Sequence, residues 1–188
     1  MNPAESISGL YLRLNGFFLL PEFTVFRGGS HQHIDLLGLR PKSGTEVAFN
    51  KDEELVDLPI DTLLFDSINH VTNNKSTEIL LGAVAEVKAN QTLEEPSPNF
   101  HWVTPFFGAV DAIVRINFTD KFTDVFVDSD TQGNFVVVGM RHALVWIRGR
   151  IKTMQTLLKL NKGESWTLSE GYLANILLLM KYDGYLDN

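Results

Sequence analysis

The chain has 188 residues, of which 44% are hydrophobic and 21% charged, enough apolar material to bury the core of one domain. It contains no cysteine, which excludes a disulfide scaffold, a cysteine-ligated zinc site and thiol catalysis. The formal net charge of −7 argues against a large nonspecific nucleic-acid surface. We expect one cytoplasmic domain over residues 1–188, because no leader signal opens the chain and no apolar run approaches the roughly 20 residues of a membrane span.

The first part of the chain predicts a helix and a hairpin. Apolar side chains recur at helical spacing over residues 4–15, and Gly16 is well placed to end that helix. Residues 17–27 are rich in β-branched and aromatic side chains, and residues 31–40 have the place of a return strand, stopped by Pro41 and Gly44. The two glycines between them predict a tight turn, so these segments should pair as antiparallel strands.

The rest of the chain alternates between helices and strands. Residues 41–78 are acidic and irregular, with one helix predicted around residues 59–69. The apolar patterns then predict a buried strand over 79–88, a helix over 102–117, a short strand over 134–139 and two helices over 144–160 and 168–182. This order of elements predicts an α/β domain with a mixed central sheet flanked by helices.

One segment has a charge opposite to that of the rest of the chain. Residues 131–163 carry six basic side chains and no acidic one, whereas residues 1–130 carry 9 basic and 19 acidic residues. Such a segment is typical either of a strip that faces phosphates or of a solvated helix face that offsets the acidic part. If it faces phosphates, Arg148, Arg150 and Lys152 are the candidate contacts to nucleic acid.

The residues that could carry chemistry lie on two predicted strands. Glu86 and Lys88 share one face of a strand, at the point where its apolar run ends. Asp35 interrupts the apolar run of another strand, where an unpaired carboxylate is costly. A divalent cation, which prefers hard oxygen ligands, is a natural partner for such groups. The alternative is that Asp35 pairs with Arg27 or Arg40, and that Glu86 and Lys88 form an incidental ion pair.

The pattern of Asp35 followed by Glu86-Val87-Lys88 resembles the PD-(D/E)xK nuclease superfamily, which includes restriction endonucleases and Holliday-junction resolvases. The resemblance covers roughly residues 4–91 and implies a restriction-endonuclease-like fold. By this similarity Asp35 and Glu86 would bind Mg²⁺ or Mn²⁺, and the carbonyl of Val87 would add a ligand. Lys88 would position the attacking water.

The sequence departs from the family pattern in two respects. Ile34 stands where the family has a proline, and the gap of 51 residues from Asp35 to Glu86 is longer than in compact members. Residues 41–78 would therefore be an insertion between adjacent strands, which a surface loop tolerates at low cost in free energy. Resolvase-like members carry a glutamate on the first helix, and Glu5 has a similar place here.

The resemblance implies a magnesium-dependent nuclease that hydrolyses DNA, and a homodimer, since many nucleases of this type pair to cut two strands. An acidic net charge and a long insertion also fit a catalytically inactive binding or assembly module of the same fold. A third reading is a small hydrolase with a histidine-bound metal, because His31, His33 and Asp35 share one strand face. In the nuclease interpretation, His33 would instead line the site, and Gln91 would contact nucleic acid.

Overall fold

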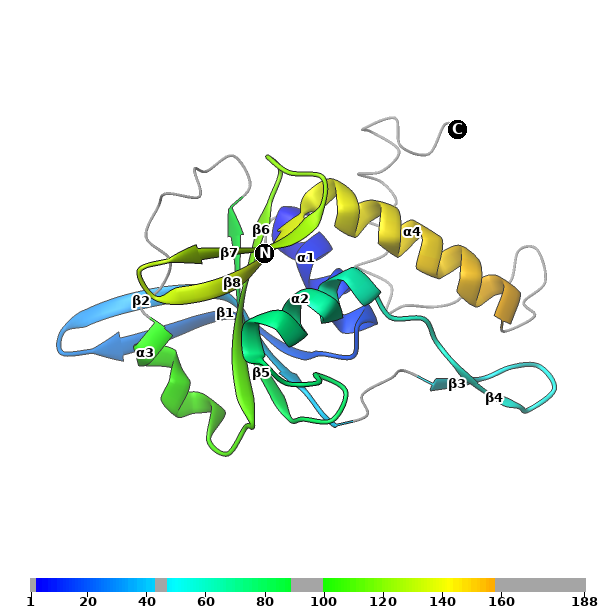
Figure 1. Ribbon diagram of the computed structural model, residues 1–188, viewed down its shortest axis with the longest axis horizontal. Coiled ribbons are helices and arrows are strands. Elements are labelled where there is room, and N and C mark those ends of the chain that lie inside the picture. The colour runs from blue at the N-terminus through cyan, green and yellow to red at the C-terminus, as the bar shows by residue number, and fades with distance from the viewer. Residues whose placement is uncertain (1–2, 43–46, 89–99, 158–188) are drawn as a thin grey trace.

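The computed structural model describes residues 3–42, 47–88 and 100–157 (Figure 1). The helices and strands are α1 (Pro3–Leu14), β1 (Phe18–Arg27), β2 (Ser30–Arg40), β3 (Val47–Phe49), β4 (Leu55–Asp57), α2 (Thr62–Thr72), β5 (Leu81–Lys88), α3 (Phe100–Val103), the 3₁₀ helix η1 (Thr104–Phe107), β6 (Ala112–Thr119), β7 (Val125–Asp130), β8 (Gly133–Gly139) and α4 (Met140–Leu157). None of the described helices is both long and apolar enough to cross a bilayer.

Six strands form a mixed sheet in the order β1-β2-β5-β6-β8-β7. The pairs β1/β2, β2/β5 and β7/β8 are antiparallel, whereas β6 lies parallel to both β5 and β8. The short strands β3 and β4 pair with each other in a separate ribbon. The fold is therefore an α/β fold with a mixed sheet and flanking helices, as the order of predicted elements indicates.

Two apolar layers cover the two faces of the sheet. The larger cluster joins α1, α2 and α4 to one face, through side chains such as Leu10, Leu64 and Ile147. The smaller cluster lies on the opposite face, where the short helix α3 contributes Val103. Along β5, Ala83 and Ala85 belong to the larger cluster and Val84 to the smaller one, as the alternation of side chains along a strand requires.

The predicted helix over residues 102–117 is wrong. Only α3 and η1 are helical there, and β6 begins at Ala112. The alternation in AIVRINFT puts Val114, Ile116 and Phe118 in the larger cluster and Arg115 and Asn117 on the other face, which is a strand pattern. The aromatic run before it has the density of a helix core and obscured this signal.

Other differences are smaller. β7 was not predicted, although it forms a hairpin with β8 across the turn expected at residues 130–133. The stretch 41–78 does lie between strands that are neighbours in the sheet, and it contains the β3–β4 ribbon in addition to the expected helix. The final helix predicted over 168–182 lies outside the described residues.

Candidate functional site

Asp35 lies at an irregularity shared by β1 and β2. The ladder pairs Pro21 with Leu36 and Phe23 with Ile34 but skips the pair between them, where Glu22 has a φ of 54°. Leu36 belongs to the larger cluster and Ile34 to the smaller one, so the alternation of β2 breaks at Asp35. The Asp35 carboxylate reaches sideways to β5, where its Oδ2 accepts a hydrogen bond from the Val87 N–H at 2.7 Å.

Glu86, on the neighbouring strand β5, makes a matching contact to the backbone of β2. The ladder pairs Leu36 with Ala85, so Glu86 comes directly beside Asp35. The Glu86 carboxylate accepts a hydrogen bond from the Asp35 N–H, while its buried Oε1 has no hydrogen-bond partner among the described residues. Each carboxylate is thus anchored to the backbone of the opposite strand, and we call Asp35 and Glu86 the carboxylate pair.

Burial dominates the electrostatics of Glu86. It raises the pKa of Glu86 to about 8; the Asp35 charge adds to this shift, and the Lys88 charge opposes it. Near neutral pH the pair therefore holds one proton that an isolated glutamate would have lost. Two adjacent carboxylates with a buried, unpartnered oxygen form a place where a positive charge is favourable.

Lys88 supplies a positive charge on the same face of β5. It is 4% exposed, and a lysine that is so deeply buried is almost always paired. Its charge lowers the pKa of both Glu86 and Asp130. The ammonium therefore acts electrostatically on both the carboxylate pair and Asp130.

Arg115 and Asp130 flank this face, and the sequence reading missed both. Arg115 donates to the two Asp130 oxygens at 2.8 Å each and to the Gly133 carbonyl at 2.6 Å. The hydrogen bond from Arg115 holds the pKa of Asp130 below its usual range. Asn117 on β6 pairs in register with Glu86 and is 3% exposed, so it extends the polar face. The polar positions of the AIVRINFT alternation would have identified Arg115 and Asn117.

The arginines proposed as alternative partners of Asp35 are engaged elsewhere. Arg40 is buried and donates to the carbonyls of Asn15 and Ser76. The guanidinium of Arg27 lies 5.9 Å from the centroid of the Trp102 ring. The neighbour of Asp35 on its own strand is His33, whose Nδ1 lies 3.5 Å from Asp35 Oδ1.

The donor set fits an ion that keeps part of its water shell. Within residues 3–42, 47–88 and 100–157, no three side chains of His, Asp or Glu form a metal-binding group. The centre considered for His31, His33 and Asp35 is therefore not formed. Mg²⁺ in proteins usually binds through one or two carboxylates and retains several waters, so two carboxylates are the number of side-chain ligands that such an ion requires.

The remaining predicted site residues lie farther from this arrangement or have other roles. Glu5 is half-buried in the first turn of α1, which packs on the face of Ala83 and Ala85 rather than that of Glu86, so its ligand role stays a prediction. Gln91 lies outside the described residues.

The three basic candidates on α4 differ in exposure. Arg150 is 2% exposed and donates to the Pro59 carbonyl, so it holds α4 to the segment before α2 and is not a free phosphate contact. Arg148 is half-buried and Lys152 exposed. Of the three, Lys152 best keeps the predicted role, although α4 packs on the face opposite Glu86.

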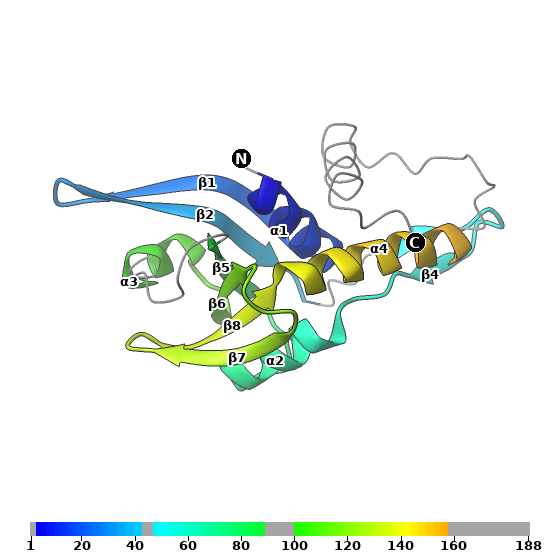
Figure 2. The same ribbon diagram turned by 90° about the horizontal axis from the view of Figure 1, so that it is seen from above.

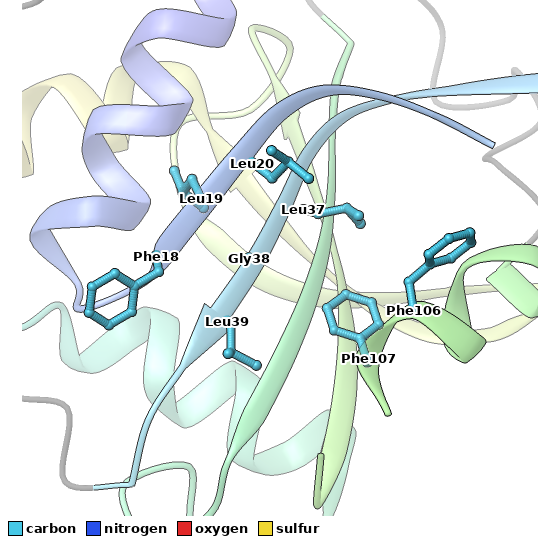
Figure 3. A pocket seen from close by; sticks show the side chains of 8 residues that line it. All are labelled: Phe18, Leu19, Leu20, Leu37, Gly38, Leu39, Phe106 and Phe107. Atoms are coloured by element: carbon cyan, nitrogen blue, oxygen red, sulfur yellow. The ribbon is translucent and has the colours of Figure 1, made fainter. Parts of the chain in front are cut away.

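An apolar groove of about 350 Å³ lies between the start of β1, the end of β2 and η1 (Figure 3). Its lining residues are Phe18, Leu19, Leu20, Leu37, Gly38, Leu39, Phe106 and Phe107. None of them is ionisable, so the groove has no group for acid–base or metal chemistry. The carboxylate pair, and not this groove, is the candidate site.

A second buried polar cluster joins α1, α2 and α4. Asp61, 3% exposed, accepts hydrogen bonds from the Tyr11 hydroxyl at 2.6 Å and from the Leu63 N–H at 3.1 Å, and its Oδ2 lies 2.6 Å from His142 Nε2. Burial alone would raise the pKa of Asp61, but the hydrogen bonds from His142 and Tyr11 outweigh it and lower the value. Because Asp61 also caps the N-terminus of α2, the cluster has a clear structural role.

No protein-family profile matches the chain, and neither a curated protein nor a solved structure matches it with significance.

Proposed function

We propose that this chain is a divalent-metal-dependent nuclease that hydrolyses DNA phosphodiester bonds, with the restriction-endonuclease-like fold that its motif resembles. The observation that carries the proposal is the reciprocal anchoring of Asp35 and Glu86 across β2 and β5, which leaves Glu86 Oε1 buried without a hydrogen-bond partner in the part of the chain that the structure describes. The parallel arrangement of β5 and β6 and the position of Lys88 support it.

Each residue would have a distinct task. Asp35 and Glu86 would hold Mg²⁺ or Mn²⁺ with the Val87 carbonyl, through the oxygens that the backbone does not occupy. The bound ion would lower the pKa of a water ligand and offset negative charge on the phosphate. Lys88 would orient the attacking water and stabilise the charge that develops during the reaction. Glu86 must release its proton before it can serve as an ionised ligand.

Cleavage assays test the proposal directly. Purified protein with Mg²⁺ or Mn²⁺ should cleave plasmid, single-stranded or branched DNA, and EDTA should abolish this. Lys88→Met should lose roughly 100-fold or more in rate, and Asp35→Asn and Glu86→Gln should lose activity. Lys75→Met and Asp66→Asn, which alter exposed residues after α2 and on α2, are the matched controls and should cleave like the wild type. If the wild type cuts none of the three substrates, the nuclease proposal is wrong.

The inactive module is the second candidate, favoured by the lack of a third side-chain ligand among the described residues. Calorimetry with Mn²⁺ separates the two functions. Binding that disappears in Asp35→Asn and Glu86→Gln supports the active site. A folded wild type that binds no Mn²⁺ supports the module.

A further inference from the structure

A third oxygen-bearing side chain lies in line with the carboxylate pair. The strands β2, β5 and β6 are consecutive in the sheet (Figure 2), and β5 lies between the other two. The ladder between β5 and β6 pairs Glu86 directly with Asn117. Their chain neighbours Ala85 and Ile116 both belong to the larger cluster, so Glu86 and Asn117 both project from the opposite face of the sheet. Asp35, Glu86 and Asn117 therefore form a row across three strands.

The Asn117 side chain is buried without a partner in the part of the chain that the structure describes. It is 3% exposed, and its amide forms no hydrogen bond with any described residue. Leaving such a group unsatisfied costs about 1–3 kcal/mol, so native proteins rarely do so. Glu86 Oε1, beside it, is also buried without a hydrogen-bond partner among the described residues. These two neighbouring polar groups do not bond to each other, so both are available to one ligand bound between them.

The surroundings of Asn117 explain why the sheet itself does not satisfy it. On the same face of β6, the Arg115 guanidinium is engaged by the Asp130 carboxylate and the Gly133 carbonyl. On β8, the residue paired in register with Asn117 is Val137, which is fully buried and apolar. The amide thus has a carboxylate on one side and a hydrocarbon side chain on the other, and the row of oxygen donors ends there.

The chemistry of an amide suits a further ligand beside two carboxylates. The side-chain carbonyl of asparagine is a hard oxygen donor of the kind that Mg²⁺ and Mn²⁺ accept. A third carboxylate would add to the repulsion that Asp35 already exerts on Glu86, whereas an amide contributes an oxygen without a charge. Within the described residues, no third His, Asp or Glu completes a metal-binding group with the carboxylate pair, so a further side-chain ligand from this part of the chain has to be neutral.

We propose that Asn117 is a third side-chain ligand of the divalent cation, through its amide oxygen, together with Asp35 and Glu86. This inference rests on the proposed metal site and adds to it a residue outside the motif that the sequence resembles. The amide oxygen would take the place of one of the waters that Mg²⁺ otherwise retains. The ion would in turn be the partner that Asn117 and Glu86 Oε1 lack among the described residues.

Isothermal titration calorimetry with Mn²⁺ tests the inference independently of cleavage. Asn117→Leu keeps the approximate shape of the side chain and removes its oxygen, so Mn²⁺ binding should weaken roughly 10- to 100-fold, a loss typical of metal sites that lose a supporting residue. Asn117→Asp retains an oxygen and should bind Mn²⁺ more tightly than Asn117→Leu. Asn134→Leu, at an exposed position on the neighbouring strand β8, is the matched control and should bind like the wild type.

Nuclear magnetic resonance gives a second readout that needs only the wild type. The side-chain amide signal of Asn117, assigned by triple-resonance experiments, should shift on addition of Mg²⁺, because coordination of the oxygen polarises the amide. The shift should saturate with the dissociation constant that calorimetry with Mg²⁺ gives. The side-chain amide signal of Asn134 should not move, since this residue is exposed and lies away from the row.

Three results would overturn the inference. They are equal Mn²⁺ binding by Asn117→Leu and Asn134→Leu, binding by Asn117→Asp no tighter than by Asn117→Leu, and an Asn117 amide signal that ignores Mg²⁺ while the ion binds. The two proposals fail separately. Mn²⁺ binding that is lost in Asp35→Asn but unchanged in Asn117→Leu contradicts the role of Asn117 alone. Mn²⁺ binding that depends on Asn117 in a protein that cleaves no DNA contradicts the nuclease alone.

Discussion

At the scale of single residues, the proposed chemistry depends on the close approach of the Asp35 and Glu86 carboxylates. Asp35 and Glu86 could be selected from the sequence because each interrupts or ends an apolar strand. Their hydrogen bonds to each other's backbone could not be predicted, because these depend on the irregular pairing opposite Glu22. Arg115 and Asn117 were missed because their segment was read as a helix.

The raised pKa of Glu86 predicts a pH-dependent stability in the absence of divalent ions. Between its ordinary pKa and about 8, the folded state holds one proton more than the unfolded chain. The contribution of Glu86 to the free energy of unfolding should therefore be highest below the ordinary pKa and fall by up to about 1.4 kcal/mol per pH unit until pH 8. Urea unfolding in EDTA from pH 5 to 9, compared between the wild type and Glu86→Gln, isolates this effect.

In that comparison the difference in stability between the two proteins should change steadily up to pH 8 and then level off. Glu78→Gln, at an exposed position, is the control and should follow the wild type. A difference that stays constant across the range would show that Glu86 ionises normally.

At the scale of elements, the β1–β2 hairpin and the apolar strand β5 could be predicted from the sequence. Strands with a weaker apolar pattern could not. β5 follows from a nearly continuous apolar run, and β2 follows from its place after a turn of two glycines and before Pro41. β7 was missed because VFVDSD has few apolar residues and is paired at one edge only. Nothing in the local sequence indicates that α1, α2 and α4 meet at Asp61.

Asp61 should be a major determinant of how these three helices pack. Asp61→Ala removes the α2 cap and leaves Tyr11 and His142 without their buried carboxylate, so we expect a loss of about 3–5 kcal/mol in unfolding free energy. Asp61→Asn keeps a capping side chain and should lose less. Chemical denaturation at neutral pH measures both, with Asp66→Asn as the exposed control on α2.

The acid dependence of Asp61 has a defined sign. Its folded pKa lies below the ordinary value, so its contribution is present above the unfolded pKa and is lost as pH falls through the folded pKa. The difference between the wild type and Asp61→Asn should therefore shrink on acidification from about pH 5. If it is unchanged at the lowest pH at which both proteins fold, the carboxylate is not the stabilising species.

At the scale of the whole molecule, the candidate site exists only in the folded chain. In the sequence, the β3–β4 ribbon and α2 lie between Asp35 and Glu86. The pairing of β2 with β5 brings the two residues together in space. A ligand of this pair should therefore bind the native state in preference to the unfolded one.

Mn²⁺ should accordingly raise the melting temperature. At a concentration of about 100 times the dissociation constant, it should add about 2.7 kcal/mol, which corresponds to roughly 5–10 °C for a chain of this size. Differential scanning fluorimetry with increasing Mn²⁺ measures the shift. Asp35→Asn should abolish it and Asp66→Asn should retain it; an equal shift in all three proteins would indicate binding elsewhere.

The bend at Pro21 and Glu22 also bears on how the protein avoids self-association. Among the described strands β1 pairs with β2 alone, so no other described strand pairs with its outer edge, which lies close to the exposed side chains of Phe18 and Leu20. Proline offers no N–H to an incoming strand, and a charged residue with positive φ interrupts the regular repeat that such a strand would need. The same irregularity that positions Asp35 therefore also hinders strand pairing between two copies of the chain along the edge of β1.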